Sequence, residues 1–564
     1  MTRIDNGLWL RIGAVVGSGL ILWSVFPPAP LGSDGVWFAL TPLLLVIRHT
    51  APRRAFWLGW LSGTVFWLLS ISWLWRLIWN NGPWPLVVFG HVALSIYCGL
   101  YTALFAMLAA RVWQVVHGRE NLATRMLAVL VMEPLLWVGL EYLRCVLLTG
   151  FPWNPLGAAT FDSPRIIQFA SIGGVYAVSL LVLLTNGAAT SMAERIYETV
   201  RNRTFGEHLI GGRLRGVETF LPLTLLAMAL LWGQNRFLDW RQRQESREPV
   251  WQVALVQPNA PCIFERNDDS ERIVRQTLLD LTAGLAVFAP DLVVWPETAL
   301  IQSLPYDEFA VTLARDGARA AGAPLLTGAV EYHPGDPARS EARRFYNAAW
   351  LFDSNGVARG WYRKQHLVPF GEYIPGDRII PALEGLSPVG FSCTAGKEST
   401  ILRIPHRVRG EGLPADELTF STLICFEDTV SALARRAVRC GARLLVNITN
   451  DAWFNGSVEP EQHLAQAVFR CVENGVPMVR VANTGVSCAI SPVGQLQVLE
   501  RNGQTSNFAG VLPCILAVPQ KPLATLYNQY GDWILARPAA LIVLLLLGVC
   551  WFSRWRRGRS ANGA

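Results

Sequence analysis

Three short motifs in the second half of the chain combine residue types that can transfer an acyl group through a covalent intermediate. Glu297 ends the run Trp295-Pro296-Glu297 after an apolar segment, where partial desolvation can raise a carboxyl pKa toward that of a general base. Lys364 precedes a loop rich in Pro and Gly, in which a fixed ammonium can stabilise an oxyanion. Cys425 stands between an apolar run and a helical stretch over 430–439. A helix start there would favour the thiolate and leave a backbone N–H free for an oxyanion hole.

Each of these residues also has an ordinary structural interpretation. Glu297 could be a surface carboxylate, Lys364 a solvated charge, and Cys425 a buried inert thiol. Lys is rare in this chain, with three residues among 49 Lys and Arg, which suggests a role at Lys364 that Arg cannot fill. Because each motif follows a predicted strand, and strand ends build the sites of open α/β sheets, the three together favour catalysis.

The elements that would position these motifs lie between about residues 249 and 519. Short apolar, β-branched runs alternate there with helical stretches, which is typical of a layered α/β domain. We expect strands over 253–257, 291–295, 325–328, 423–424 and 444–448.

Long apolar runs flank this domain on both sides. The chain is 51% hydrophobic and 16% charged, against about 25% charged in average soluble proteins. The runs are apolar all round and rich in Trp near their ends, as membrane spans are. The first run could be a signal peptide, but no cleavage site follows it. We expect seven spans within a transmembrane domain at 1–235 and an eighth at 533–552; the first seven cover 12–26, 35–47, 55–75, 85–110, 126–148, 166–184 and 220–232.

Arginine placement orients this bundle. Alternate connections hold the basic residues Arg48, Arg53, Arg54, Arg111, Arg119, Arg125, Arg195, Arg201, Arg203, Arg213, Arg215, Arg554, Arg556, Arg557 and Arg559. The intervening connections hold Arg76 and Arg165. By the positive-inside rule, we expect both termini to be cytoplasmic and the α/β domain to lie on the outer side, which in a bacterium is the periplasmic side of the inner membrane. The net charge of +7 reflects this placement, and no basic stripe interleaved with aromatics indicates a nucleic-acid partner.

Charged residues within a span are costly and suggest function. The run over 126–148 contains Glu133, Glu141 and Arg144. Glu141 and Arg144 are three residues apart, so they share a helix face and can form a structural ion pair inside the bundle. The alternative is that they line a lipid-entry surface beside Gly150-Phe151-Pro152-Trp153.

The ten Cys residues include no C-x-x-C pair and no nearby Cys/His cluster. We therefore expect neither a metal site nor a dense disulfide framework, and no cofactor. No G-x-S-x-G elbow occurs, which argues against a serine hydrolase.

The order Glu297, Lys364, Cys425, each in its own motif, resembles the nitrilase superfamily. That resemblance implies an α-β-β-α sandwich, here inserted before the last span. With the spans, the following runs resemble the bacterial apolipoprotein N-acyltransferases: Glu141-Tyr142-Leu143-Arg144, Gly150-Phe151-Pro152-Trp153, Trp295-Pro296-Glu297, His366-Leu367-Val368-Pro369-Phe370-Gly371-Glu372 and Asn450-Asp451-Ala452-Trp453-Phe454.

This resemblance implies a role for each matching residue. Glu297 would be the base, Lys364 the oxyanion-stabilising residue and Cys425 the nucleophile. Glu372 would be an auxiliary acid, with Glu427 and Phe426 as supporting residues. The implied substrate contacts are Trp295, Trp453, Phe454, Glu141 and Arg144. Three departures affect the match: Phe426 stands where the family commonly has Tyr, Asn455 where it has Gly, and the segment 258–268 lacks a Trp, with Phe264 its nearest aromatic.

The implied reaction moves an acyl chain from a membrane phospholipid to the Cys thiol, and then to the N-terminal amine of a lipidated apolipoprotein. A membrane-tethered amidase that passes the acyl group to water is the nearest alternative, but a soluble substrate gives no reason for eight spans. A transporter or lipid-binding protein with an inactive domain is a second, and the intact set of Glu, Lys and Cys argues against it.

Overall fold

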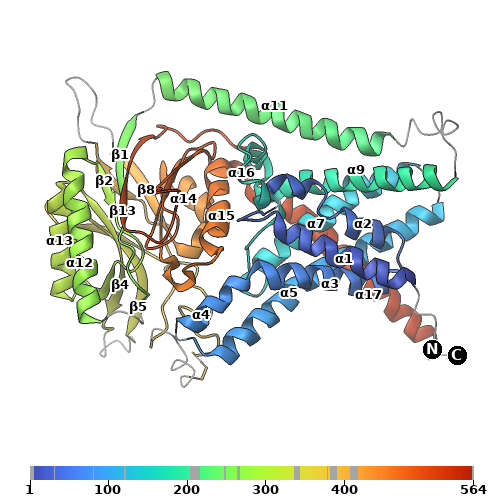
Figure 1. The fold of residues 1–564 in the computed structure, drawn as a ribbon, viewed down its shortest axis with the longest axis horizontal. Coiled ribbons are helices and arrows are strands. Elements are labelled where there is room, and N and C mark those ends of the chain that lie inside the picture. The colour runs from blue at the N-terminus through green and yellow to red at the C-terminus, as the bar shows by residue number, and fades with distance from the viewer. Residues whose placement is uncertain are drawn as a thin grey trace. The chain divides into compact units, whose positions relative to one another are not determined.

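The computed structural model describes two compact units, both visible in Figure 1. One unit comprises Met1–Trp75, Pro85–Arg236 and Gln529–Ala564, and the other comprises Arg76–Trp84 and Phe237–Asn528. The described residues are 6–30, 32–80, 82–119, 122–202, 216–246, 249–262, 267–335, 343–377, 379–380, 390–406 and 417–561. The predicted basic residues Arg203, Arg213 and Arg215 lie outside these ranges, as does Phe264.

The first unit is a helical bundle. Its main helices are α1 (Asn6–Ser24), α2 (Thr41–Arg48), α3 (Pro52–Ser70), α5 (Trp84–Arg119), α6 (Leu122–Leu127), α7 (Glu133–Val146), α9 (Val175–Asn202), α11 (Val217–Ser246) and α17 (Ala536–Ala561). A π-helical turn over Ala128–Met132 joins α6 to α7. Within the described ranges, six helical segments are long and apolar enough to cross a bilayer. A seventh is the bent pair Pro52–Ser70 and Ser72–Trp79, so the protein is a multi-pass membrane protein.

The second expected span, 35–47, is not a continuous helix. A 3₁₀ turn over Ser33–Trp37 precedes α2, whose eight residues reach about 12 Å of the roughly 30 Å of hydrocarbon. The segment nevertheless returns the chain to the end of the bundle where α1 begins. Arg11 of α1 donates to Thr50 at 3.3 Å, and Ser18 of α1 donates to the Ala39 carbonyl at 2.7 Å. The structure therefore does not form one membrane-spanning helix over 35–47, because hydropathy reports an apolar environment and not helix continuity.

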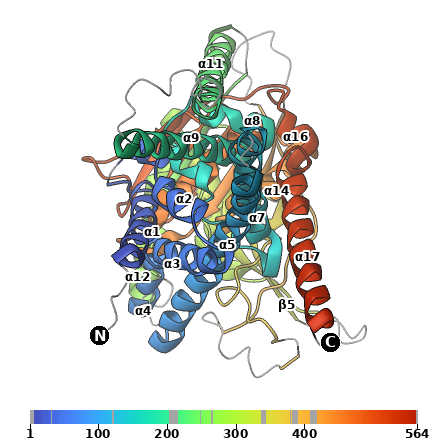
Figure 2. The same cartoon turned by 90° about the vertical axis from the view of Figure 1, so that its right-hand side faces the viewer.

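The last helix returns to the bundle after the α/β domain. Figure 2 shows α17 running beside α7, and the two helices touch at Gly139. A Cβ at Gly139 would lie 2.5 Å from the carbonyl oxygen of Ala539. The close backbone contact thus depends on a residue without a side chain.

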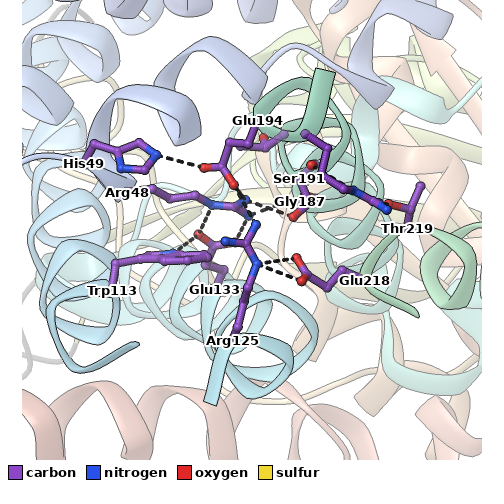
Figure 3. Close-up of polar contacts among 12 residues, drawn as sticks. Arg48, His49, Trp113, Arg125, Glu133, Gly187, Ser191, Glu194, Glu218 and Thr219 are labelled. Carbon is purple, nitrogen blue, oxygen red and sulfur yellow. Dashed lines mark hydrogen bonds and ion pairs between the residues drawn. The ribbon is translucent and has the colours of Figure 1, made fainter. Parts of the chain in front are cut away.

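A network of buried ion pairs ties five helical segments together at one end of the bundle (Figure 3). Arg48 of α2 pairs with Glu133 of α7 at 2.7 Å, and both side chains are almost fully buried. Arg125 of α6 lies 2.7 Å from Glu194 of α9 and 2.7 Å from Glu218 of α11. Each carboxylate of the network has a guanidinium partner. The presence of the charged Glu133 inside an apolar segment is therefore explained by ion pairing within the bundle.

The second unit contains two mixed β-sheets. One has the order β13-β1-β2-β4-β5-β6, with β3 also paired to β4, and the other has the order β12-β11-β10-β9-β8-β7. The strands of the first sheet are β1 (Val250–Gln257), β2 (Leu292–Val294), β3 (Leu300–Leu304), β4 (Leu325–His333), β5 (Arg344–Phe352), β6 (Ala358–Arg363) and β13 (Gly510–Ala517). Those of the second are β7 (Leu402–Pro405), β8 (Glu417–Ile424), β9 (Leu444–Thr449), β10 (Met478–Ala482), β11 (Cys488–Ile490) and β12 (Leu496–Val498).

These sheets pack face to face, with helices outside, as the alternation of side chains along β1 shows. Val253 and Leu255 belong to a core shared with the second sheet, including Phe420 and Val446. The alternate residue Val256 packs toward the helices α12 (Asp268–Ala283) and α13 (Glu308–Ala321). On the second sheet the corresponding helices are α14 (Ser431–Arg439) and α15 (Glu459–Asn474). The predicted α-β-β-α sandwich is confirmed.

Candidate active site

Three strand ends bring Glu297, Lys364 and Cys425 together. Glu297 lies three residues after β2, Lys364 follows β6 directly, and Cys425 follows β8 directly. The Lys364 ammonium is 3.7 Å from the nearer Glu297 carboxylate oxygen, and both residues are buried. The charges of both act on the pKa of the Cys425 thiol, so the three predicted residues share one site.

The electrostatics of this site favour a thiol at rest. Burial and, after it, the neighbouring Glu297 charge raise the pKa of the Cys425 thiol to about 12, although Lys364 opposes both. Burial also raises the pKa of Glu297, against the charge of Lys364. The predicted lowering of the thiol pKa by a helix start is therefore wrong, because desolvation outweighs it. A carboxylate with a raised pKa is, however, a better proton acceptor for the thiol.

The nucleophile candidate sits in a strained turn. Cys425 has φ of 52°, in the left-handed region that non-glycine residues rarely adopt. A 3₁₀ helix over Cys425–Thr429 follows β8 at once, and α14 begins at Ser431. The predicted strand-to-helix elbow is present, with this short 3₁₀ turn inserted before the α-helix.

Asn347, in the middle of β5, links the two acidic residues of the site. Its side-chain amide nitrogen donates to Glu297 and to Glu372, each at 2.7 Å. Glu372 also lies 3.0 Å from the Lys364 ammonium and accepts from the Val368 backbone N–H at 2.9 Å. Glu372 is thus part of the site. Sequence reasoning missed Asn347, although a lone amide within an apolar strand was a signal.

Glu427 connects the Cys425 turn to the Lys364 loop. Its carboxylate accepts hydrogen bonds from the backbone N–H of Ile424, from those of Gln365 and His366, and from the Tyr362 hydroxyl, at 2.6–3.0 Å. Burial raises the pKa of Glu427 to about 7, although the Ile424 N–H stabilises the charged form. Glu427 therefore sets the position of the lysine loop against the nucleophile turn.

The backbone beside Glu297 is held against β4 by a glycine. A Cβ at Gly328 would lie 2.6 Å from Glu297 Cα and 2.6 Å from the Pro296 carbonyl oxygen. Thr298, the next residue, has φ of 49°, and its hydroxyl accepts from the Asn450 amide at 2.8 Å. The base candidate therefore lies on a closely packed turn.

The aromatic residues predicted to contact substrate divide into two groups. Trp295 is fully buried in the core beneath α12 and α13 and donates to Thr282 at 3.0 Å. Its prediction as a substrate contact is wrong, because Trp295 continues the side-chain alternation of β2 and packs on the same side as Val293, in the core beneath the helices. Trp453 and Phe454 are partly exposed. Phe426 stacks on His366, with ring centroids 5.8 Å apart.

In the bundle, Glu141 and Arg144 do not pair with each other. Glu141 accepts from the Leu156 backbone N–H at 2.6 Å, and Arg144 donates to the carbonyls of Phe151 and Trp153 at 2.6 and 2.7 Å. Both side chains line a mostly apolar cavity of about 50 Å³ within the bundle. Their main contacts fix the chain turn that follows α7, which differs from the predicted ion pair.

Asn455 has an ordinary backbone conformation, with φ of −46°. The left-handed residue in this loop is the next one, Gly456, with φ of 68°. Replacement of the usual family Gly by Asn455 therefore needs no unusual geometry.

Asp451, Glu459 and His463 bring their side-chain ligand atoms within 4.8 Å of one another. Their environment already contains positive charge, since Arg480 lies 3.1 Å from Asp451. Burial lowers the pKa of His463, but the carboxylate of Asp428, 2.8 Å away, helps to raise that pKa well above its ordinary value. An imidazolium and a guanidinium thus balance the carboxylates, and we interpret the group as an internal charge network.

Comparison with known proteins covers both units. The family model for the apolipoprotein N-acyltransferase N-terminal domain matches residues 18–188, and the carbon-nitrogen hydrolase model matches residues 252–507. An amidase from Nesterenkonia sp. AN1, with a covalent adduct at its active-site cysteine, has a TM-score of 0.33 at 19% identity and covers 51% of this chain and 96% of its own.

Full-length relatives agree with both family models. Proteins named apolipoprotein N-acyltransferase from Geobacter metallireducens and Allorhizobium ampelinum are 33% and 31% identical to this chain. The alignments cover 94% and 97% of this chain and 94% and 96% of the relatives. A third, from Gloeobacter violaceus, is 30% identical over 95% of this chain and 93% of its own. With both domains matched in order and nearly the whole length aligned, this chain belongs to the apolipoprotein N-acyltransferase family.

Proposed function

We propose that this protein transfers an acyl chain from a membrane phospholipid, through a thioester on Cys425, to the N-terminal amine of a lipidated apolipoprotein. The observation that supports this most directly is the group formed by the buried Glu297 and Lys364 and the partly buried Cys425, which follow the strands β2, β6 and β8. Family membership supplies the substrate classes, and the apolar helical segments supply the membrane setting.

In the first step, Cys425 Sγ attacks the ester carbonyl of the donor while its proton passes to Glu297. Negative charge develops on the carbonyl oxygen, where the Lys364 ammonium can stabilise it. The tetrahedral intermediate then collapses by breaking the ester C–O bond. The leaving alkoxide takes the proton from Glu297 and departs as a lysophospholipid, so that the thioester remains.

In the second step, the acceptor amine attacks the thioester carbonyl and gives a proton to Glu297. The C–S bond breaks, the amide forms, and the proton returns to the Cys425 thiolate. The raised pKa of the Cys425 thiol suits this order, because the resting enzyme keeps the proton that the cycle needs. Glu372 contacts Lys364 and Asn347, and both of these residues also contact the base Glu297. We therefore assign Glu372 a supporting role.

We further propose that the catalytic domain faces the periplasm and that both termini are cytoplasmic, as the arginine counts predict. Single-cysteine labelling within the connection over 201–215 tests this orientation in a variant lacking the native cysteines. A membrane-impermeant reagent should label that connection after the cells are opened and should not label it in intact cells. Labelling from outside in intact cells would contradict the topology.

The activity is tested by the mass of the intact protein after incubation with phospholipid alone. We expect one acyl adduct on Cys425, and none in Cys425→Ala, which lacks a nucleophilic atom, or in Cys425→Ser, since a hydroxyl is far harder to ionise than a thiol in the same surroundings. Addition of a lipidated peptide with a free N-terminal amine should discharge the adduct onto the peptide. Discharge to water alone would instead indicate an amidase. An adduct that persists in Cys425→Ala would move the nucleophile to another cysteine, with Cys440, Cys471 and Cys488 the next to test.

A further inference from the structure

Two polar residues stand side by side in the interior of the second sheet, beneath the Cys425 turn. Asn447 of β9 is in register with Arg480 of β10 and with Leu423 of β8. Both polar side chains are fully buried. An Arg in the middle of a buried strand is uncommon, because burying a guanidinium costs far more than burying an apolar side chain of similar size. The hydrogen-bond partners of Arg480 therefore indicate what this buried guanidinium does.

The Arg480 guanidinium bonds to three different side chains. One nitrogen donates to Asn447 Oδ1 at 2.7 Å and to Asp428 at 3.1 Å, and the other donates to Asp451 at 3.1 Å. Asp428 belongs to the same 3₁₀ turn as Cys425, and Asp451 begins the next loop. Arg480 therefore holds both loops and the Asn447 amide at once.

Arg480 also fixes which way the Asn447 amide points. A guanidinium only donates, so the Asn447 atom facing it must be the oxygen, and the amide nitrogen must point the other way. That nitrogen donates to the Cys425 carbonyl at 3.2 Å and to the Leu423 carbonyl at 3.3 Å. Arg480 thus fixes the orientation of the Asn447 amide through its oxygen, and this orientation lets the amide nitrogen donate to the Cys425 carbonyl.

From these contacts we propose that Asn447 is a positioning residue of the nucleophile, oriented by Arg480. Its amide holds the Cys425 carbonyl toward β9 and so supports the left-handed conformation, φ of 52°, that presents Sγ to Glu297 and Lys364. This inference rests on the proposed role of Cys425. Neither Asn447 nor Arg480 touches a reacting atom; both act through the backbone of the turn.

The test is Asn447→Asp in the full-length enzyme. Aspartate has the same shape and still accepts from Arg480, but it cannot donate to the Cys425 carbonyl. We expect the first-order rate constant of acyl-enzyme formation from phospholipid to fall roughly 10- to 100-fold, the range for a small misplacement of a reacting group. The amplitude of labelling, which counts folded enzyme, should stay near that of the wild type.

Thr422→Val is the matched control. Thr422 is buried on β8 three residues before Cys425, and its hydroxyl has no hydrogen-bond partner in the described part of the chain. This isosteric change should leave both rate constant and amplitude unaltered. Arg480→Lys is the second variant, because it keeps the positive charge but loses the planar guanidinium whose two nitrogens reach three acceptors. We expect its rate constant of acyl-enzyme formation to fall as well.

The proposal is overturned if Asn447→Asp and Arg480→Lys retain the wild-type rate constant, whether or not their amplitudes fall. A loss of amplitude alone would make both residues structural only. Failure of the proposed function looks different, because the wild-type enzyme itself would then carry no acyl adduct on Cys425.

Discussion

The ammonium of Lys364 lies 3.0 Å from a carboxylate oxygen of Glu372, closer than its 3.7 Å separation from Glu297. Burial lowers the pKa of Lys364, but Glu372 and then Glu297 outweigh it and raise that pKa above its ordinary value. Lys364 is therefore a permanent cation in this site. A charge held by two carboxylates can stabilise an oxyanion without donating its proton, which leaves proton transfer to Glu297.

Lys364→Arg should abolish most of the activity despite keeping the charge. A planar guanidinium cannot occupy the space of a compact ammonium between Glu297 and Glu372. We expect acyl-enzyme formation to slow by about 10²–10³-fold, the loss typical of an oxyanion donor. Rapid-quench measurement of labelled protein checks the value. Lys397→Arg, at an exposed position, is the control, and near-normal acylation by Lys364→Arg would make Lys364 a structural charge.

Glu297→Gln should change the two reactions of Cys425 in opposite directions. The Glu297 charge raises the pKa of the Cys425 thiol, so its removal lowers that pKa and increases the thiolate fraction at a given pH. Alkylation by a small haloacetamide should therefore begin at lower pH than in the wild type, while burial still keeps the profile alkaline. Acylation by phospholipid should slow, because the proton acceptor is gone. A fall in both rates at every pH would show that Glu297 assists alkylation too, against this account.

Gly328→Ala should impair the site from the neighbouring strand. The added methyl would lie 2.6 Å from Glu297 Cα, so either β4 or the Glu297 turn must shift. A displacement of about 1 Å can cost on the order of 100-fold in rate. Gly284→Ala is the control, because nothing lies within 4 Å of the position that its added methyl would take and its φ of −61° suits alanine. Equal acylation rates in the two variants would show that the contact with Glu297 is not needed.

Glu133→Gln should weaken the membrane unit without touching the catalytic residues. It leaves Arg48 buried with its nearest carboxylate gone, and loss of one partner of a buried pair costs about 3–5 kcal/mol. Thermal unfolding in detergent should show a clear decrease in the midpoint. Arg54→Gln, at an exposed position six residues after Arg48 in the chain, should not. An unchanged midpoint in Glu133→Gln would indicate that water or lipid replaces the pair.

Glu297 and Cys425 were predictable because each closely follows an apolar strand, and Lys364 was predictable from the Pro- and Gly-bearing loop that follows it. Asn347 was not, since it lies within β5 and its partners Glu297 and Glu372 are 50 and 25 positions away. Only the folded sheet brings them together. Trp295 misled for a related reason: it is two residues from Glu297 in a recognisable motif, but its side chain packs with that of Val293 in the core beneath the helices.

In the bundle, hydropathy indicated apolar segments but not their form. The expected span over 35–47 reads as apolar, and the break between Trp37 and Thr41 leaves no mark on an average over that run. The Glu141 and Arg144 prediction failed similarly. Their spacing of three residues permits an ion pair, but backbone groups of the following turn compete successfully for both side chains.

The segment Arg76–Trp84, which connects two apolar helices of the bundle, belongs to the catalytic unit. Asn80 donates to the Trp453 carbonyl at 2.7 Å, and Arg76 donates to the Gly456 carbonyl. A soluble fragment that begins at Phe237 would contain all three main site residues and yet lack both donors to this loop. The catalytic unit is therefore assembled from two separate stretches of chain, and excising the longer one for crystallisation or inhibitor screening would yield an incomplete enzyme.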